Sequence, residues 1–215
     1  MIKGTRMMMK RGAPTPPLPY DAEVEYLEST GTQWIDTGVV GDIDTTIGIT
    51  WLKTQEIQYA VAQNLMGAAN GAWNNHPINL SMYHYGSIGF GNNGQSGWGV
   101  YHYTANTMYT VSLGKSGLFV NGAFVVSTGN SLTTINTVYP ISIFSFNQGR
   151  GINEPGSFRC YGASIKSGDT LVRDFIPVRF TNEQDQTEGA MYDRVSGELF
   201  RNAGTGAFTI GPDKS

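Results

Sequence analysis

Short runs of alternating apolar and polar residues recur along almost the whole chain, and each run ends in residues typical of tight turns. Residues 45–52 alternate Ile47, Ile49 and Trp51 with smaller or polar residues, and residues 78–85 repeat the pattern. Because successive side chains of a strand point to opposite faces, this period of two predicts strands with one buried face. Turn sequences lie between such runs: Asn-Gly at 121–122, Ser-Gly-Asp at 167–169 and Ser-Gly-Glu at 196–198.

The spacing of these runs predicts an all-β fold, an antiparallel two-sheet sandwich or a barrel, because turns recur roughly every 8–12 residues. The 215 residues include 28 glycines, and only 14% are charged, which argues against a helical bundle. This length suits one large all-β domain or two small domains. The expected strands cover 24–26, 33–36, 45–52, 78–85, 87–91, 98–103, 109–113, 117–120, 123–127, 141–146, 158–166, 170–177 and 199–210. We expect a surface loop at 89–99 and a helical or loop-like segment at 181–189.

Residues 1–20 differ from the rest of the chain. They contain four cations and no acid, which leaves −7 for the remainder of a chain whose net charge is −3. Their prolines favour an extended arm that does not fold by itself. We expect this arm to be held by its own domain or, preferably, a partner subunit, because four charges are few for nucleic-acid binding. The residues that define the arm are Lys3, Arg6, Lys10, Arg11, Pro16 and Pro17.

The single cysteine, Cys160, excludes an intrachain disulfide and gives no support for an oxidising compartment. Met7, Met8 and Met9 form the only apolar run of the arm, which is too short for a signal peptide. No later stretch approaches the roughly 18 apolar residues of a membrane span. We therefore expect a soluble protein without a secretion signal.

Four segments resemble, in the same order, the laminin-G-like, concanavalin-A-like lectin and glucanase jelly-roll domains found in proteins of gut bacteriophages and prophages. They are VEYLESTGTQWIDTGV (24–39), LFVNGAFV (118–125), YGASIKSGDTLVRDFIPVR (161–179) and GAMYDRVSGELFRNAGTGAF (189–208). The resemblance spans residues 20–213 and implies a jelly-roll sandwich at 21–215 behind the arm at 1–20. Each segment also has a mechanical interpretation: Asn121-Gly122 suits a type I′ hairpin that pairs Phe119 with Phe124. We interpret these residues as framework.

The resemblance further implies a non-enzymatic virion protein. Such a protein decorates a capsid, head fibre or tail, and the arm would attach it to other virion proteins. We expect an assembled multimer, located in virions that form in the bacterial cytoplasm, with no cofactor and no membrane partner.

Carbohydrate binding is the alternative function. Sugar sites combine aromatic faces with planar polar side chains, and exposed loop aromatics are unusual unless they are used. Residues 70–76 and 91–99 supply such side chains, which predicts a shallow lectin site for host-surface or mucus glycans. The residues of this predicted site are Trp73, Asn74, Asn75, Trp98 and Tyr101. The asparagines have a second explanation, since they are common in turns.

A third function class, glycoside hydrolysis, rests on Glu23, Glu25 and Glu28. Their E-x-E-x-x-E spacing resembles the E-x-D-x-x-E of jelly-roll β-glucanases, and retaining chemistry needs two carboxyl groups about 5–5.5 Å apart. Here the middle residue differs and the motif lies in the first strand rather than on a central one. We prefer a solvated strand face and predict no catalytic residue.

Metal sites are also not expected. The three histidines are His76, His84 and His102, and the last two each lie between tyrosines. Two such strands side by side could form a stacking platform or hold a metal. We prefer ordinary cross-strand packing. Asp42 and Asp44 could offer oxygens to Ca²⁺ but cannot fill its roughly 6–8 positions alone.

Overall fold

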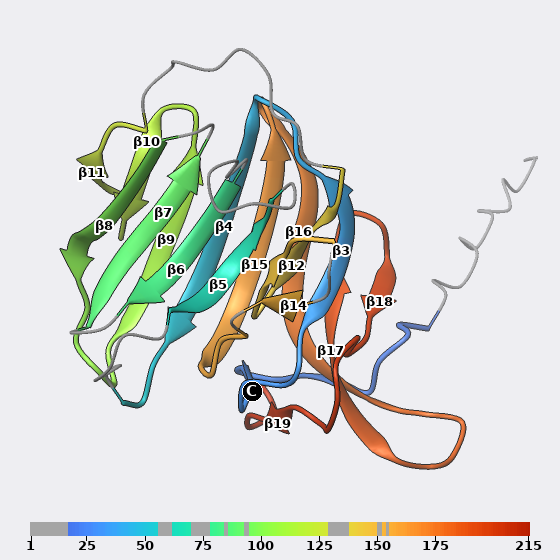
Figure 1. Ribbon diagram of the computed structural model, residues 1–215. Coiled ribbons are helices and arrows are strands. Elements are labelled where there is room, and N and C mark those ends of the chain that lie inside the picture. Colours follow the sequence, from blue (N-terminus) through green and yellow to red (C-terminus); the bar gives the residue numbers. More distant parts are fainter. Residues whose placement is uncertain are drawn as a thin grey trace, which may run out of the picture.

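The computed structural model describes residues 17–55, 62–69, 78–83, 86–92, 95–128, 138–149, 152–153 and 155–215. Nineteen strands and no helix occur in these ranges, and they form two sheets stacked face to face (Figure 1). The all-β sandwich predicted from the sequence is thereby confirmed. Among the described strands, every pairing is antiparallel except that of β13 with β5.

The first sheet has the order β11-β10-β9-β4-β15-β16-β17-β18, with β1 beside β16 and β2 between β15 and β19. Its strands are β1 (Ala22–Glu23), β2 (Leu27–Glu28), β4 (Thr45–Leu52), β9 (Met108–Gly114), β10 (Gly117–Val120), β11 (Ala123–Val126), β15 (Arg159–Ser167), β16 (Thr170–Thr181), β17 (Thr187–Asp193), β18 (Glu198–Phe200) and β19 (Thr209–Ile210).

The second sheet has the order β14-β13-β5-β6-β7-β8, and β12 joins β5 to β3. Its strands are β3 (Ile35–Val40), β5 (Gln63–Ala68), β6 (Ile78–Tyr83), β7 (Ser87–Asn92), β8 (Gln95–His102), β12 (Pro140–Ile143), β13 (Phe146–Asn147) and β14 (Ile152–Asn153).

The hydrophobic core lies between the sheets. Strand β4 supplies Ile47, Ile49 and Trp51, which are at most 1% exposed, whereas the alternate residues of β4 remain partly exposed. Leu65 of β5 and Leu80 of β6 belong to the same buried cluster. Each such side chain contributes about 1.5–3 kcal/mol through burial. The alternation that predicts strand 45–52 is therefore the pattern that builds the core.

Two predicted segments lie in hairpins, and neither is a loop over its whole length. Residues 89–99 were expected to form a surface loop, but β7 continues to Asn92 and β8 begins at Gln95. Gly89 and Gly91 pair with Ser81 and Asn79 of β6, so these glycines belong to a strand. Residues 181–189 form the β16–β17 hairpin, in which the Asn182 Oδ1 accepts hydrogen bonds from the backbone N–H groups of Gln184 and Gln186.

The predicted strand 199–210 is also interrupted. Strand β18 ends at Phe200 and β19 begins at Thr209, and the residues between them bond to the N-terminal part of the chain. The backbone N–H of Ala203 donates to the Trp34 carbonyl, and that of Thr205 donates to the Thr32 carbonyl. These long-range bonds replace a strand ladder that the local pattern alone predicts.

The turn at 29–33 has a structural role. Gln33 is 3% exposed, and its Oε1 accepts hydrogen bonds from the Thr30 N–H at 2.9 Å and from the Ser29 Oγ at 3.1 Å. Its Nε2 donates to the Thr205 carbonyl at 3.2 Å. Gly31 has φ = +104°, a backbone conformation that favours glycine. These contacts agree with the interpretation of this segment as framework.

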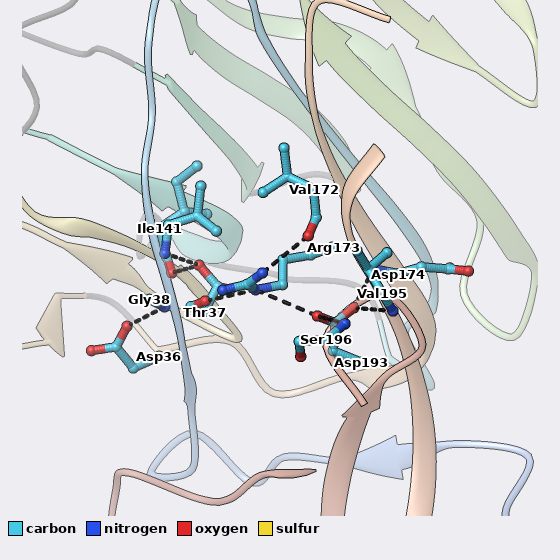
Figure 2. Close-up of polar contacts among 11 residues, drawn as sticks. Asp36, Thr37, Gly38, Ile141, Val172, Arg173, Asp174, Asp193, Val195 and Ser196 are labelled. Carbon is cyan, nitrogen blue, oxygen red and sulfur yellow. Dashed lines mark hydrogen bonds and ion pairs between the residues drawn. The ribbon is translucent and has the colours of Figure 1, made fainter. Parts of the chain in front are cut away.

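A buried polar cluster ties the two sheets together (Figure 2). Asp193 is fully buried, and its carboxylate accepts the backbone N–H groups of Asp174 at 2.7 Å and of Val195 and Ser196 at 3.1 Å each. The Arg173 Nε lies 3.6 Å from the Asp193 Oδ2 and donates to the Thr37 carbonyl of β3 at 3.3 Å. All of these side-chain polar groups serve the framework.

Candidate functional site

The outer face of the first sheet, the face opposite the core, carries a groove of about 310 Å³. Its floor is formed by neighbouring strands β9, β4, β15 and β16. Gly48 on β4 pairs with Ser112 on one side and with Ser164 on the other, and Gly162 on β15 pairs with Thr50. Because directly paired residues point to the same face, these small residues together line the groove.

The two glycines explain why this surface is hollow. Gly48 and Gly162 lie inside central strands and neither has a positive φ, so the backbone conformation does not require glycine there. A Cβ at position 48 would lie 2.9 Å from the Ser164 Oγ. A glycine inside a strand often marks a place where another group approaches the backbone closely. The floor of the groove is thus bare backbone.

Hydroxyl groups surround this bare floor. The Thr50 and Thr110 Oγ1 atoms are 3.0 Å apart and share a hydrogen bond. The Ser112 and Ser164 hydroxyls, in contrast, make no hydrogen bond to the residues that the structure describes. A hydroxyl both donates and accepts, so these groups can bond to a polar ligand in either sense.

One end of the groove is charged. The Arg194 Nη2 lies 2.6 Å from the Asp174 Oδ2, and the Arg194 Nε donates to the same oxygen at 2.9 Å. Both side chains keep contact with solvent, and Figure 2 shows the Asp174 side chain pointing away from the buried Arg173 cluster. The second carboxylate oxygen, Oδ1, accepts no hydrogen bond from the described part of the chain.

A tyrosine forms another wall. Strand β15 has an irregularity between Cys160 and Gly162, and this places Tyr161 on the groove. The Tyr161 ring lies 5.5 Å from the ring of Tyr26, over which the Arg159 guanidinium stacks at 4.4 Å. Arg159 in turn donates to the Glu28 carboxylate at 2.9 Å. Burial raises the pKa of the Tyr161 phenol, which keeps it a neutral hydrogen-bond donor.

Of the predicted glycan-binding residues, the structure describes Trp98 and Tyr101, and these two side chains differ in their surroundings. Trp98 on β8 is 47% exposed, but Tyr101 on the same strand packs against the core with its ring 6.0 Å from Tyr109. Trp73, Asn74 and Asn75 lie outside the described residues. The groove residues Gly48, Ser164 and Asp174 were not among the sequence predictions. The available signal was a pair of glycines within strongly alternating strands.

The described end of the arm lies next to the first sheet. Pro17 is exposed, and the Tyr20 ring packs on Tyr192 of β17 at 4.9 Å. The remaining residues that define the arm, Lys3, Arg6, Lys10, Arg11 and Pro16, lie outside the described ranges.

The three glutamates of the hydrolase hypothesis do not share a strand. Glu23 lies in β1, Glu28 in β2, and exposed Glu25 between them. Glu28 pairs with Arg159 at 2.9 Å and Glu23 with Lys214 at 3.8 Å. Each of these two carboxylates has its own cationic partner, which is the arrangement of framework ion pairs. The groove itself contains one carboxyl group, that of Asp174, among the residues that line it.

The other predicted polar groups have structural contacts. Asp42 accepts hydrogen bonds from Thr45 and Ser167, and Asp44 pairs with Lys115 at 3.4 Å. His102 lies on β8 opposite Ser87, whereas His76 and His84 are outside the described residues. Within the described ranges no three His, Cys, Asp or Glu side chains gather as a metal site requires. Likewise, no helix in those ranges is long and apolar enough to cross a bilayer.

Comparisons with known proteins support the fold. No protein-family model matches the sequence, and no curated protein matches it significantly. A provisionally assigned carbohydrate-binding protein of Bacteroides ovatus superimposes with a TM-score of 0.62 at 12% identity, over 90% of this chain. The chain spans only 61% of that protein's length. The CBM40 module of the Ruminococcus gnavus IT-sialidase, solved with α2,3-sialyllactose, gives a TM-score of 0.52 at 16% identity, over 67% of this chain and 91% of the module. At these identities the likeness shows the shared β-sandwich fold.

Proposed function

We propose that the protein binds carbohydrate without changing it chemically, and that the groove on the first sheet is the binding site. The observation that carries this proposal is the bare backbone floor at Gly48 and Gly162, flanked by the Asp174–Arg194 pair and by two serine hydroxyls that make no hydrogen bond within the described part of the chain. The two similar solved structures, both of carbohydrate-binding proteins, support the same function.

The chemistry of the groove suits a sugar. A sugar ring carries hydroxyl groups that donate and accept, and Asp174 offers an acceptor while Arg194 offers several donors. Ser112 and Ser164 add hydroxyls that a ligand can use without breaking a hydrogen bond to any described residue. The volume of about 310 Å³ is at the small end for ligand sites. These features support a shallow site of moderate affinity.

The same lining argues against hydrolysis. Glycosidases generally use two carboxyl groups that flank the scissile bond, about 5–9.5 Å apart. Among the described residues that line the groove, Asp174 alone offers a carboxyl group, and it is already paired with Arg194. A non-catalytic role therefore fits the residues better than an enzymatic one.

A glycan array followed by calorimetry tests this proposal on the full-length protein. Asp174→Asn keeps the shape of the side chain but removes its charge, and we expect at least tenfold weaker binding, because hydrogen bonds to charged groups contribute about 1.5–3 kcal/mol. Asp169→Asn is the matched control, since Asp169 is exposed at the tip of the β15–β16 hairpin.

Trp98→Ala distinguishes the groove from the predicted loop site. If Trp98→Ala abolishes binding while Asp174→Asn leaves it unchanged, the ligand binds at β8 and the groove is not the site. Absence of binding by every glycan at millimolar concentration would refute the proposed function itself.

The virion role remains a prediction from the sequence resemblance. It places the protein on other virion proteins, with the arm as its attachment. Co-purification with virions, compared between the full chain and a variant lacking residues 1–20, tests it. Equal association of the two proteins would show that the arm does not attach the protein.

A further inference from the structure

We infer that the ligand is an extended, uncharged oligosaccharide whose chain crosses the strands of the first sheet and ends on the aromatic pair Phe119–Phe124. This inference rests on the proposed function and specifies its ligand class. It concerns the length of the site, the side chains at its far end and its charge.

The groove belongs to one continuous row of paired residues. Phe124 of β11 pairs with Phe119 of β10, and Phe119 pairs with Ser112 of β9. The row continues through Gly48 of β4 and Ser164 of β15 to Asp174 of β16. Paired residues in adjacent strands point to the same face, so all six side-chain positions lie on the outer surface of the sheet.

Exposure confirms that this row is open to solvent. Phe124 is 59% exposed and every other member of the row is at least partly exposed, whereas Leu113, Ile47 and Ile165 in the adjacent row are buried in the core. The row therefore forms an accessible track from an aromatic end to a charged end.

The aromatic end is held in place by its hairpin. Asn121 and Gly122 have φ values of +50° and +79°, the positive values that a type I′ turn needs. The two phenyl rings meet edge to face with centroids 5.6 Å apart. Gly117 makes room for this pair, because a Cβ there would lie 2.8 Å from the Phe124 ring. An exposed phenyl ring on a rigid hairpin is a surface on which the apolar face of a sugar can pack.

The length of the row sets the size of the ligand. Five inter-strand steps separate Phe124 from Asp174, and at about 4.8 Å each they span roughly 24 Å. One pyranose ring covers only a fraction of that distance. A ligand that contacts both ends must be a linear oligosaccharide of several rings that runs perpendicular to the strands.

The charge of the row sets the ligand's chemistry. The charged groups that line the groove are Asp174 and Arg194, and they neutralise each other at 2.6 Å. An acidic sugar would need a cation that is not already paired, and it would lie beside the Asp174 carboxylate. A neutral chain of hydroxyl groups needs no unpaired cation, and the Asp174 carboxylate does not repel it.

Calorimetry with neutral cello-, laminari- and manno-oligosaccharides, from monosaccharide to hexasaccharide, tests the inference, with a sialylated trisaccharide as the acidic probe. We expect affinity to rise with chain length in the series that binds. Phe124→Ala should weaken the binding of the hexasaccharide roughly tenfold, about 1.4 kcal/mol, and leave the disaccharide unaffected. Asp174→Asn should weaken both. Val40→Ala removes another exposed apolar side chain, 49% exposed against 59% for Phe124, from the second sheet and serves as control.

The outcomes separate the inference from the proposed function. Binding that is independent of chain length, or a hexasaccharide affinity unaffected by Phe124→Ala, overturns the extended ligand but leaves carbohydrate binding intact. Tighter binding of the acidic trisaccharide than of any neutral glycan overturns the uncharged ligand. If no glycan on the array binds, the proposed function fails first. Circular dichroism of Phe124→Ala verifies that the exposed edge hairpin still folds.

Discussion

Lys53 provides a test of how the fold accommodates a buried charge. It follows β4 directly and is only 7% exposed. Its Nζ donates to the Gln63 Oε1 at 2.8 Å and to the Ser157 carbonyl, both of them uncharged acceptors. Burial lowers the pKa of Lys53 from 10.5 to about 8, and the nearby Glu28 carboxylate offsets only part of this effect. The folded protein therefore holds a cation that would be better solvated in the unfolded chain.

This difference predicts the direction of a pH effect. Between pH 8 and 10.5 the unfolded chain binds more protons at Lys53 than the folded protein does, so the free energy of unfolding rises with pH in this window. Below pH 8 the cost of burying the charge is present in full. The pKa difference, at about 1.4 kcal/mol for each pH unit, corresponds to a rise of about 3 kcal/mol.

Denaturant unfolding of the wild type and Lys53→Met, measured from pH 7 to 10.5, tests this reasoning. Other groups titrate in the same window, so the informative quantity is the difference between the two proteins at each pH. Lys53→Met should lack the rise in the free energy of unfolding between pH 8 and 10.5. The variant loses the hydrogen bond to the Ser157 carbonyl, but the Gln63 Oε1 still accepts the Ser157 N–H at 3.1 Å. Lys115→Met is the control, because that lysine side chain is 56% exposed. Parallel curves for the wild type and Lys53→Met would refute the reasoning.

Three further predictions concern stability. Asp193→Ala removes the buried carboxylate that accepts three backbone N–H groups and should lower the free energy of unfolding by about 3 kcal/mol in urea titrations, whereas a loss below about 1 kcal/mol would contradict its framework role. Burial alone would raise the pKa of Asp193, but these N–H donors hold it below 3.8. The stability that the carboxylate contributes should therefore be lost as the pH falls below that value. Asp193→Asn should lack this loss in acid titrations. Gly122→Ala should lower the free energy of unfolding by about 1 kcal/mol in thermal melts, because a φ of +79° is unfavourable for alanine. No atom lies within 4 Å of the new Cβ, so the backbone conformation is the whole cause of this loss. An unchanged melting temperature would show that the hairpin tolerates alanine.

The sequence allowed the strands and their turns to be predicted where the signal is local. The alternation at 45–52 predicts β4 with its observed bounds, because burial of every second residue is a property of the strand itself. The strand predicted at 117–120 also has the observed bounds of β10. Asn121-Gly122 predicts its turn for the same reason, since positive φ values are a property of those residues. The resemblance added the sandwich architecture. Local patterns failed at 199–210, where bonds to residues more than 150 positions away decide the conformation.

The groove shows what only the tertiary structure decided. Gly48 of β4 and Ser112 of β9 are distant in the sequence from each other and from the β15–β16 hairpin that carries Ser164 and Asp174. No local pattern records that β4 lies between β9 and β15. Strand order depends on which faces bury together across the whole chain, and this is a collective property of the core. Trp98 and Tyr101 show the converse: they are close in sequence, yet one is exposed and the other packs on the core. Residue types along the chain specify which strands form, whereas packing of the two sheets determines which side chains share a surface.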